Sequence, residues 1–377
     1  MKLLMISGDR SILQRKQGAF WYTLQELRKH FDQIDVITPQ IIIPRLKGES
    51  KSKAGESALI GGSVFFHPCP NRLLRQPRWI VKKGKELIKA FGHDVMTVHE
   101  YPPFYNGIGA KKLAKKMNIP YALEVHHIVG YPKAVTTSER IGKMTSKSYF
   151  PRAAKSATAI RVVNKEVGGK LLTWGVPKSK INLVPSFYLD GDILTTDHAP
   201  PVIYDVVFCG RLVPNKGLEN LILAVSKLSN VRLAVIGSGP ELLNHEKLVS
   251  KLGLDNLVTF LGWLPTQETV VGALLSSRIF VMPSQSEGGP RSLLEAMAVE
   301  MPVITTPVGV VPEIIEDGVN GIITNGEPDD MAEKIESLLA DEKLRKKMGK
   351  EAGKIMDIYE RKNLVKAYAD FLKSLCD

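Results

Sequence analysis

Several features that define other protein classes are scarce in this sequence. Its 377 residues include only three cysteines, Cys69, Cys209 and Cys376, which lie too far apart to indicate a disulfide framework or a Cys-x-x-Cys zinc site. No apolar run approaches the roughly 18 residues that a membrane-spanning helix needs. The four apolar residues 3–6 are too few for the core of a signal peptide. We therefore expect a protein of the reducing cytoplasm.

The composition is that of a globular protein, with 44% hydrophobic and 24% charged residues. At roughly 150 residues per domain, the length predicts two or three domains. The net charge of +12 is unevenly distributed: residues 1–200 hold 32 Lys and Arg against 15 Asp and Glu, whereas residues 201–377 hold 19 against 24. A basic half can attract anionic lipid, nucleic acid or a polyanionic substrate, or it can simply be a solvated basic surface.

Short apolar runs alternate with stretches of helical period in both halves. The expected strands are 2–7, 34–38, 95–99, 122–126 and 159–163, and then 206–209, 232–236, 258–260, 279–282 and 302–304. The expected helices of the second half are 217–229, 240–252, 267–276, 291–299 and 328–348. This pattern predicts two doubly wound, Rossmann-like α/β domains, each with a parallel sheet covered on both faces, and a cleft between them. We place the first domain at residues 1–190 and the second at 191–359, and we expect a helix at about 360–377 to pack back on the first.

In such folds ligands bind at the carboxyl ends of the strands, so the turns that follow the strands are the candidate sites. Arg211 and Lys216 follow the strand 206–209, and a guanidinium beside an ammonium suits a diphosphate, although both could simply face solvent. Gly237 opens a Gly-Ser-Gly turn in which backbone amides can approach an anion or a flat base. This turn is not a nicotinamide fingerprint, because Leu242 stands where the third glycine belongs.

The most specific stretch is residues 282–298, MPSQSEGGPRSLLEAMA, in which a strand ends, a Gly-Gly-Pro loop follows and a helix begins. The free amides of that helix start offer an anion site. Glu287 precedes the loop, and Glu295 lies about one turn inside the helix. A carboxylate near a phosphate is disfavoured by repulsion, so we expect both to accept hydrogen bonds from sugar hydroxyls. Taken singly, each could be a capping or surface carboxylate.

In the first half, the sequence Glu124-Val125-His126-His127 ends a strand. Adjacent strand residues point to opposite faces, so His126 and His127 are not expected to bind one metal ion. His126 is a candidate site residue, with a histidine packed in the cleft wall as the alternative. His99, at the end of another strand, is a weaker candidate of the same kind.

Residues 71–91 interleave seven cations with apolar residues and one tryptophan, Trp79. This composition is typical of a basic amphipathic helix on an anionic membrane, and a solvated helix of the first domain is the alternative. Nucleic acid is less expected, because Trp79 and Phe91 are the only aromatic residues in this segment that could stack on bases.

The motifs together resemble a known family. SEGGPRSLLEAMA, with GRLVPNKG and VIGSGPE before it and PVITTPVGVVPEIIEDGVNG after it, is similar to the retaining GT-B glycosyltransferases of the glycosyltransferase 4 family, also called glycosyl transferases group 1. In the first half KQGAFWYTLQEL, DVMTVHEYP and YALEVHHIVG fall in the family's order. The resemblance implies a GT-B fold, two Rossmann-like domains with an interdomain cleft. It also implies transfer of a sugar from a nucleotide diphosphate-sugar to an acceptor hydroxyl with retention of anomeric configuration.

The resemblance implies roles for individual residues. Arg211 and Lys216 would hold the diphosphate, and Glu295 the ribose hydroxyls. Glu287 and His126 would act as catalytic residues at the donor sugar. The remaining implied contacts are Gly18, Gly289, Pro290 and Arg291 at the diphosphate or sugar, and Gly237 and Trp263 at the base. Gly18 follows Gln17, where many members of the family have a second glycine.

The implied mechanism is a front-face substitution in which the leaving diphosphate accepts the acceptor's proton. We expect no cofactor and no obligatory metal, because two cations substitute for one and no plausible Asp-x-Asp site appears. The expected partners are a UDP- or GDP-sugar and a sugar, lipid-linked or lipid acceptor, with peripheral membrane association through residues 71–91. One alternative is a GT-B sugar-nucleotide epimerase or phosphorylase; an epimerase would convert the donor without an acceptor. The other is a non-catalytic sugar-nucleotide-binding subunit. The presence of Arg211, Lys216, Glu287 and Glu295 argues against a non-catalytic subunit.

Overall fold

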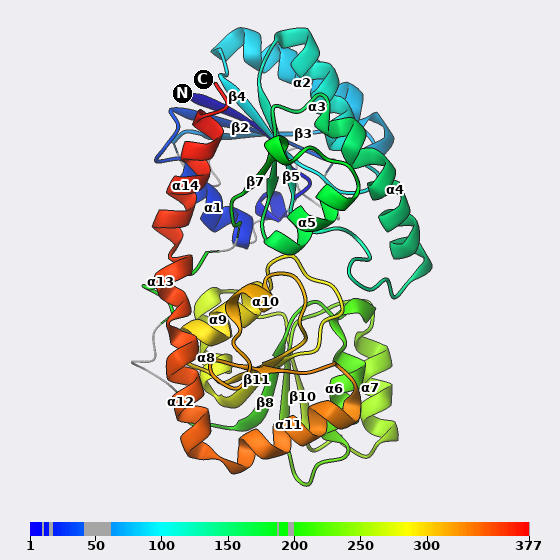
Figure 1. Cartoon of the computed structure of the whole chain (residues 1–377), viewed down its shortest axis with the longest axis vertical. Helices are drawn as coiled ribbons and strands as arrows, with labels where there is room; N and C mark the ends of the chain where they lie inside the picture. The colour runs from blue at the N-terminus through cyan, green and yellow to red at the C-terminus, as the bar shows by residue number, and fades with distance from the viewer. Residues whose placement is uncertain (10, 15–17, 41–61, 187, 195–199, 377) are drawn as a thin grey trace, which may run out of the picture. The chain divides into compact units, whose positions relative to one another are not determined.

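The computed structural model describes residues 1–9, 11–14, 18–40, 62–186, 188–194 and 200–376. The chain divides into two compact units (Figure 1): the first contains residues 1–129, 141–186 and 362–377, and the second contains residues 130–140 and 187–361. The sequence analysis placed residues 130–140 in the first domain. The structure groups them with the second unit, where the Tyr131 carbonyl accepts a hydrogen bond from the Ser286 hydroxyl.

The described part of the first unit contains a seven-stranded sheet in the order β3-β2-β1-β4-β5-β6-β7. All neighbouring strands run parallel. The strands are β1 (Lys2–Ile6), β2 (Gln33–Thr38), β3 (Val64–Pro68), β4 (Val95–His99), β5 (Tyr121–Val125), β6 (Ala159–Val162) and β7 (Ile181–Leu183). The sequence analysis missed β3 and β7, which are the two edge strands. β3 offers only the short run of residues 64–66 before polar residues and prolines, and β7 is three residues long with no fully buried residue, so both signals are weak.

The helices of this unit are α1 (Ala19–Leu27), α2 (Gln76–Phe91), α3 (Tyr105–Met117), α4 (Thr137–Ala154), α5 (Lys165–Thr173) and α14 (Arg361–Lys373), with the 3₁₀ turns η1 (Ile12–Gln14), η2 (Leu73–Arg75) and η3 (Lys178–Lys180). The first turn of α4 and the first residue of α14 fall in the second unit. Helix α2 packs tightly on α3 through Ile80, Gly84 and Leu87, which are buried. A Cβ at Gly84 would collide with the Leu113 side chain of α3. The apolar face of α2 is therefore used inside the unit.

The second unit holds a six-stranded parallel sheet in the order β10-β9-β8-β11-β12-β13 within its described residues. Its strands are β8 (Tyr204–Cys209), β9 (Leu233–Ile236), β10 (Val258–Gly262), β11 (Ser277–Met282), β12 (Val303–Thr305) and β13 (Ile322–Ile323). Its helices are η4 (Pro214–Lys216), α6 (Leu218–Val225), α7 (Leu242–Lys251), α8 (Gln267–Leu275), α9 (Arg291–Ala298), α10 (Val311–Ile314), α11 (Pro328–Ala340), α12 (Glu342–Gly353) and α13 (Ile355–Tyr359). Helices α6, α7 and α11 gather on one side of the sheet and α8, α9 and α12 on the other (Figure 1).

One helix expected from the sequence is divided into two helices in the structure. The sequence predicted a single helix over 328–348, but α11 ends at Ala340 and α12 starts at Glu342. The break lies at Asp341, whose backbone is extended and whose carboxylate accepts a hydrogen bond of 2.9 Å from the Leu344 amide. Asp is a favoured helix N-cap, and this interaction begins a new helix.

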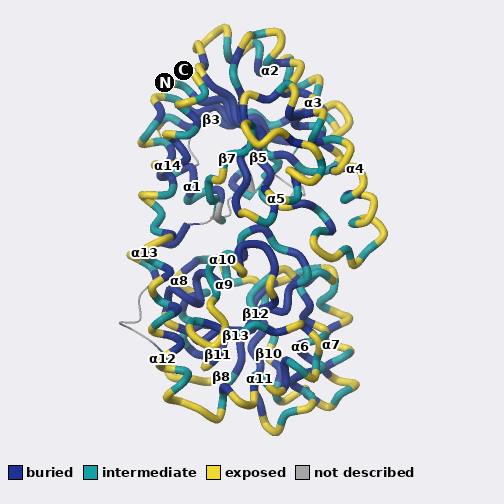
Figure 2. Tube along the Cα trace, in the orientation of Figure 1, coloured by how far each residue is buried: buried dark blue, intermediate teal, exposed yellow. Residues whose placement is uncertain are grey.

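Central strands are buried along their length in both units (Figure 2), as expected for parallel sheets covered on two faces. In each sheet the strand order reverses beside the first strand of the unit, between β1 and β4 and between β8 and β11. Doubly wound sheets bind ligands at this switch point, outside the carboxyl ends of the strands. The topology thus selects the loops after β1, β4, β8 and β11 as candidate sites.

Among the described helices, none is both long enough and apolar enough to cross a membrane.

Candidate functional site

The loops after β8 and β11 meet at the switch point of the second unit. The Gln285 amide donates a 2.8 Å hydrogen bond to the Asn215 carbonyl, and this joins the two loops. The Lys216 ammonium forms an ion pair with the Glu287 carboxylate, 71 residues away in sequence. Both side chains are largely buried, with exposed fractions of 17% and 11%. Two residues that the sequence analysis assigned to different parts of a ligand therefore contact each other.

Glycine permits this close approach of the loops. Gly217 follows Lys216 with φ of +70°, a left-handed conformation that other residues rarely adopt. A Cβ at this position would collide with the carbonyl oxygen of Pro283 in the loop after β11. The turn after β8 can therefore lie directly against the neighbouring loop, which brings Lys216 to Glu287.

Arg211 is the second cation of the loop after β8. Its side chain is exposed, and no described residue accepts a hydrogen bond or forms an ion pair with its guanidinium. Lys216 also retains binding capacity, because an ammonium has three N–H donors and can keep Glu287 while donating to a second oxygen. The loop can therefore offer two cations to an anion.

Helix α9 begins beside these cations. Pro290 is its N-cap, with Gly289 immediately before it, and its first turn contains no acidic residue. The Ser292 hydroxyl donates a 2.9 Å hydrogen bond to the carbonyl of Cys209, which ties the start of α9 to the end of β8. The first amides of a helix lack intrahelical acceptors and carry positive partial charge, so this end can bind an anion.

Glu295 is buried one turn inside α9. Its Oε1 atom accepts hydrogen bonds from Arg291 Nε at 2.8 Å and from Gln267 Nε2 at 2.9 Å. No described residue donates to its Oε2 atom, which can therefore accept from a ligand hydroxyl. Gln267 was missed by the sequence analysis, and no local signal marks it, because it comes from α8, 28 residues before Glu295.

The Cys209 thiol lies near the same carboxylate. Burial, reinforced by Glu295, raises the pKa of Cys209 to about 12. A thiol with such a pKa stays protonated at neutral pH and is a poor nucleophile. The chemistry of this site thus depends on its charged and hydroxyl-accepting groups.

Gly237 and Trp263 follow β9 and β10. Gly237 has φ of +134°, and a Cβ there would collide with the carbonyl oxygen of Gly210. Its amide donates a 2.8 Å hydrogen bond to the Gly262 carbonyl. Backbone packing thus requires this glycine. Trp263 is 59% exposed, and its contact with a base, like that of Gly237, stays a prediction.

In the first unit, a buried charge cluster lies at the carboxyl ends of β5 and β6. The Glu124 carboxylate is fully buried, and its Oε2 atom accepts hydrogen bonds from Arg161 Nη1 at 2.7 Å and from His126 Nε2 at 2.9 Å. Its Oε1 atom accepts from the hydroxyls of Tyr368 and Thr97. The sequence analysis named His126 as a site residue and His99 as a weaker candidate, but it did not assign Glu124, Arg161, Tyr368 or Thr97 to a site. A signal was present, since Glu124 and Arg161 are charges inside apolar strands.

The charges in this cluster are well defined. Burial would raise the pKa of Glu124, but Arg161, His99 and His126 together hold that pKa well below its ordinary value. Burial lowers the pKa of His99 to about 4, so His99 is neutral at pH 7. The cluster therefore contains one carboxylate and one guanidinium with a partly exposed His126 at its edge. His127, by contrast, is exposed.

Gly18 is the N-cap of α1 and has extended backbone with φ of −103°. The first turn of α1 contains no acidic residue, so its amides could meet an anion. Gln17, named in the sequence analysis, lies outside the described residues.

Only one group of described residues could hold a metal ion, namely His99, Glu124 and His126, whose ligand atoms lie within 4.8 Å of one another. The donor set fits poorly, because the shared carboxylate oxygen already accepts from Arg161 and a divalent cation there would lie beside the guanidinium. Asp190 and Asp192 form an Asp-x-Asp pair, which the sequence analysis did not consider a plausible metal site, and Asp190 pairs with Arg361. Metal independence stays a prediction.

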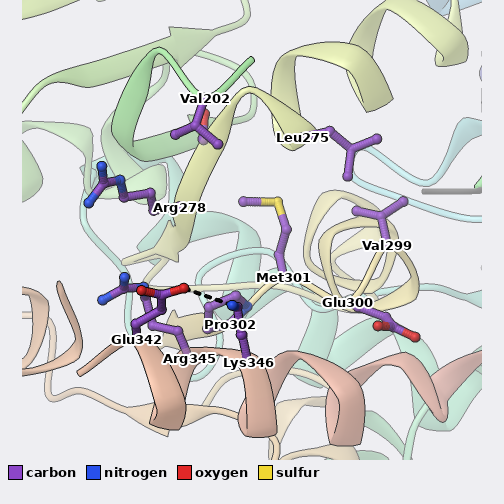
Figure 3. Close-up of a pocket in the computed structure, with 11 residues that line it drawn as sticks. Val202, Leu275, Arg278, Val299, Glu300, Met301, Pro302, Glu342, Arg345 and Lys346 are labelled. Carbon is purple, nitrogen blue, oxygen red and sulfur yellow. Dashed lines mark ion pairs between the residues drawn. The ribbon is translucent and has the colours of Figure 1, made fainter. Parts of the chain in front are cut away.

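A separate cavity of about 420 Å³ lies at the amino ends of the second sheet, beside Ser277 of β11 and Pro302 before β12 (Figure 3). Its cations already have partners. Lys346 pairs with Glu342 at 2.7 Å, and Arg345 donates to a backbone carbonyl at 2.8 Å. This cavity lies at the opposite end of the strands from the loops described above, and we assign it no function.

Comparison with known proteins shows the family and the fold. The profile described as "Glycosyltransferase Family 4" matches residues 19–188, and that described as "Glycosyl transferases group 1" matches residues 201–355. Sulfoquinovosyl transferase SQD2 of Arabidopsis thaliana is 28% identical over 366 residues, which cover 91% of this chain and 67% of that protein.

Solved structures share the fold. Sucrose-phosphate synthase from Thermosynechococcus elongatus has a TM-score of 0.80 at 18% identity, covering 100% of this chain and 99% of that one. Anabaena Alr3699/HepE in complex with UDP-glucose has a TM-score of 0.74 at 17% identity, covering 99% of this chain and 100% of that one. The expected GT-B architecture is confirmed, and the chain belongs to the glycosyltransferase 4 family, the glycosyl transferases group 1.

Proposed function

We propose that the protein transfers a sugar from a nucleotide diphosphate-sugar to an acceptor hydroxyl with retention of anomeric configuration. One observation carries the proposal: at the switch point of the second sheet, Lys216 pairs with Glu287 beside the exposed Arg211 and the start of α9. Positive charge for a diphosphate and a carboxylate for sugar hydroxyls thus lie together. Oε2 of Glu295, a short distance along the same helix, suits a ribose hydroxyl.

In this proposal, the main electrostatic task is to stabilise the leaving diphosphate. Charge on the diphosphate oxygens grows as the glycosidic bond breaks, and cations fixed in advance stabilise that charge more than they stabilise the ground state. Arg211, Lys216 and the first amides of α9 are such groups. We therefore propose transfer without an obligatory metal, the diphosphate itself accepting the proton of the acceptor hydroxyl.

The direct experiment measures product formation from a panel of nucleotide-sugars and acceptors. UDP-glucose is the first donor to test, because the Alr3699/HepE structure, which shares the fold, contains it. We expect release of the nucleoside diphosphate only with an acceptor present, and NMR of the product should show the anomeric configuration of the donor. Conversion of donor alone would favour an epimerase. Binding without turnover of any pair would favour a non-catalytic subunit, and an inverted product would refute retention.

We further propose that the acceptor is a lipid or lipid-linked sugar, reached at an anionic membrane surface. Because the apolar face of α2 is buried, the membrane contact proposed here is its amino end with η2. Leu74 on η2 is 76% exposed, and Leu73 beside it is also exposed. Next to them, a cavity of about 300 Å³ is lined by Arg75, Arg78 and Lys82, with Trp79, Asn71 and Pro70. No described acidic side chain forms an ion pair with these three cations.

Vesicle binding tests this membrane contact. A double substitution, Arg78→Glu with Lys82→Glu, removes two cations worth about 1 kcal/mol each near an anionic surface, so we expect at least roughly tenfold weaker binding to vesicles containing phosphatidylglycerol. The matched control is Lys111→Glu with Lys115→Glu on α3, which changes the net charge equally. Equal loss in both variants would indicate general charge attraction. Binding that ignores acidic lipid would refute the contact.

A further inference from the structure

The cluster around Glu124 has a function beyond joining strands. We propose that Glu124, held by Arg161 and Tyr368, is a positioning residue that fixes the orientation and tautomer of His126. The nitrogen left for substrate is then Nδ1, which accepts a hydrogen bond from a sugar hydroxyl. This inference rests on the proposed sugar transfer.

The geometry leaves the carboxylate little freedom. Each oxygen of Glu124 accepts two hydrogen bonds, Oε2 from Arg161 and His126 and Oε1 from the hydroxyls of Tyr368 and Thr97. Arg161 is itself held, since its Nε donates to the Val184 carbonyl at 3.0 Å. Its guanidinium carbon lies 3.6 Å from the centre of the Tyr368 ring. A carboxylate with four donors around it presents Oε2 to His126 in one direction.

The charge on Glu124 determines the tautomer. An ionised carboxylate can only accept hydrogen bonds, so His126 Nε2, at 2.9 Å, must carry the proton. A neutral imidazole carries one proton, which leaves the lone pair on Nδ1. The other groups facing this pair are Arg161, which neutralises Glu124, and His99, which is uncharged at neutral pH.

Burial separates His126 from the rest of the cluster. Glu124, Arg161, Tyr368 and Thr97 are all buried, whereas the His126 side chain is 39% exposed. A purely structural ion pair between Glu124 and Arg161 would need no partly exposed imidazole on the same oxygen. The arrangement resembles the general device in which a buried carboxylate orients a histidine whose other nitrogen meets the substrate.

Tyr368 makes the C-terminal helix part of this device. It belongs to α14 and lies 244 residues from Glu124 in sequence. Its hydroxyl binds the oxygen that His126 does not use, so it acts on His126 only by holding the carboxylate. We therefore expect a change at Tyr368 to reach the reaction through Glu124.

The main test is a double-mutant cycle between Glu124 and His126. Glu124→Gln keeps the shape of the side chain but removes its charge, and the amide can turn either its oxygen or its nitrogen toward His126, so the imidazole is no longer held to one orientation and tautomer. We expect kcat to fall about 10- to 100-fold, the range known for residues that orient a metal-bound histidine, with donor KM nearly unchanged. In His126→Ala, the same substitution should change kcat less than about twofold. An equal loss in both backgrounds would overturn the proposal.

A second variant guards against a folding defect in Glu124→Gln. Tyr368→Phe removes one hydrogen bond to Glu124 and leaves its ion pair with Arg161. We expect a smaller fall in kcat, about threefold, that also disappears in His126→Ala. The matched control is Tyr149→Phe, which removes a tyrosine hydroxyl bonded to the buried Glu100 of the same unit and should leave kcat unchanged. Equal effects of the two tyrosine variants would contradict the role of Tyr368.

The tautomer can be observed without turnover. In protein with ¹⁵N-labelled histidine, the signals absent from His126→Ala identify His126, and we expect a protonated Nε2 and an unprotonated Nδ1. Protonation at Nδ1, or averaging between the two forms, would refute the inference. If no donor and acceptor pair reacts, the proposed function fails while this measurement still decides the tautomer.

Discussion

Replacing Lys216 by alanine tests the pairing at the switch point of the second unit. Lys216 and Glu287 form a largely buried ion pair. If Lys216 also donates to the diphosphate, Lys216→Ala should weaken UDP binding by about 1.5 to 3 kcal/mol, the range for hydrogen bonds to charged groups. That corresponds to roughly 10- to 150-fold in the dissociation constant. Uridine, which lacks phosphates, should bind almost as before.

The ion pair adds a second expectation. Without Lys216, the Glu287 carboxylate loses its partner and repels the diphosphate, so part of the loss comes from Glu287. Lys216→Ala combined with Glu287→Gln should therefore bind UDP more tightly than Lys216→Ala alone, by about 1 kcal/mol, a coupling usual for residues in contact. Glu287→Gln alone should bind UDP at least as tightly as the unmodified protein, because the competing acceptor for Lys216 has lost its charge.

Calorimetric titration of the four proteins with UDP and with uridine measures all of these terms. If a panel of nucleoside diphosphates shows that another one binds more tightly than UDP, that nucleotide and its nucleoside replace UDP and uridine in the titrations. Equal losses for UDP and uridine would show that Lys216 does not act on the phosphates. A double variant that binds no better than Lys216→Ala would show that Glu287 does not compete for the cation, and the reasoning from the ion pair would be wrong.

Three further predictions concern other residues. Glu287→Gln should lower kcat strongly and leave UDP affinity nearly unchanged. Glu295→Gln should mainly raise donor KM and weaken UDP binding, because the contacts of Glu295 exist in the ground state and the transition state alike. Steady-state kinetics and calorimetry distinguish these two roles, and the opposite pattern would reverse the assignment. Turnover should persist in excess EDTA, and a complete loss that Mg²⁺ restores would refute metal independence. Burial raises the pKa of Glu100 to about 7, so between the ordinary value near 4.5 and 7 the folded protein keeps a proton that the unfolded chain has released. The free energy of unfolding should therefore fall as pH rises across that range, and urea titrations of Glu100→Gln should show less of this fall.

Much of the fold could be predicted because its signals are local. Central parallel strands are buried on both faces and read as continuous apolar runs, so the runs at 95–99 and 279–282 were recognised as strands. β3 and β7 were missed, because the apolar run of β3 is only three residues long and β7 is a three-residue strand with no fully buried residue. The break at Asp341 was missed because the segments on both sides of it have helical spacing; the Asp341 carboxylate accepts a hydrogen bond from the Leu344 amide and begins a new helix.

The site residues likewise fall into those that the sequence predicted and those that it did not. The residues of the strand-end turns, such as Arg211 and Glu287, were selected from sequence because each lies directly after a strand, where a doubly wound sheet binds ligands. The partners of these residues were not predicted. Gln267 reaches Glu295 from a neighbouring helix, and nothing in its own segment indicates that contact.

The sequence by itself determined the two parallel α/β units and the chemistry at the ends of their strands, because strand burial, glycine turns and helix starts depend on residues a few positions apart. The tertiary structure decided which of those groups meet. Strand order places β8 beside β11, and only this brings Lys216 to Glu287. The return of α14 to the first unit brings Tyr368 to Glu124. Such contacts depend on the packing of distant segments around a common sheet, which no local pattern of residues specifies.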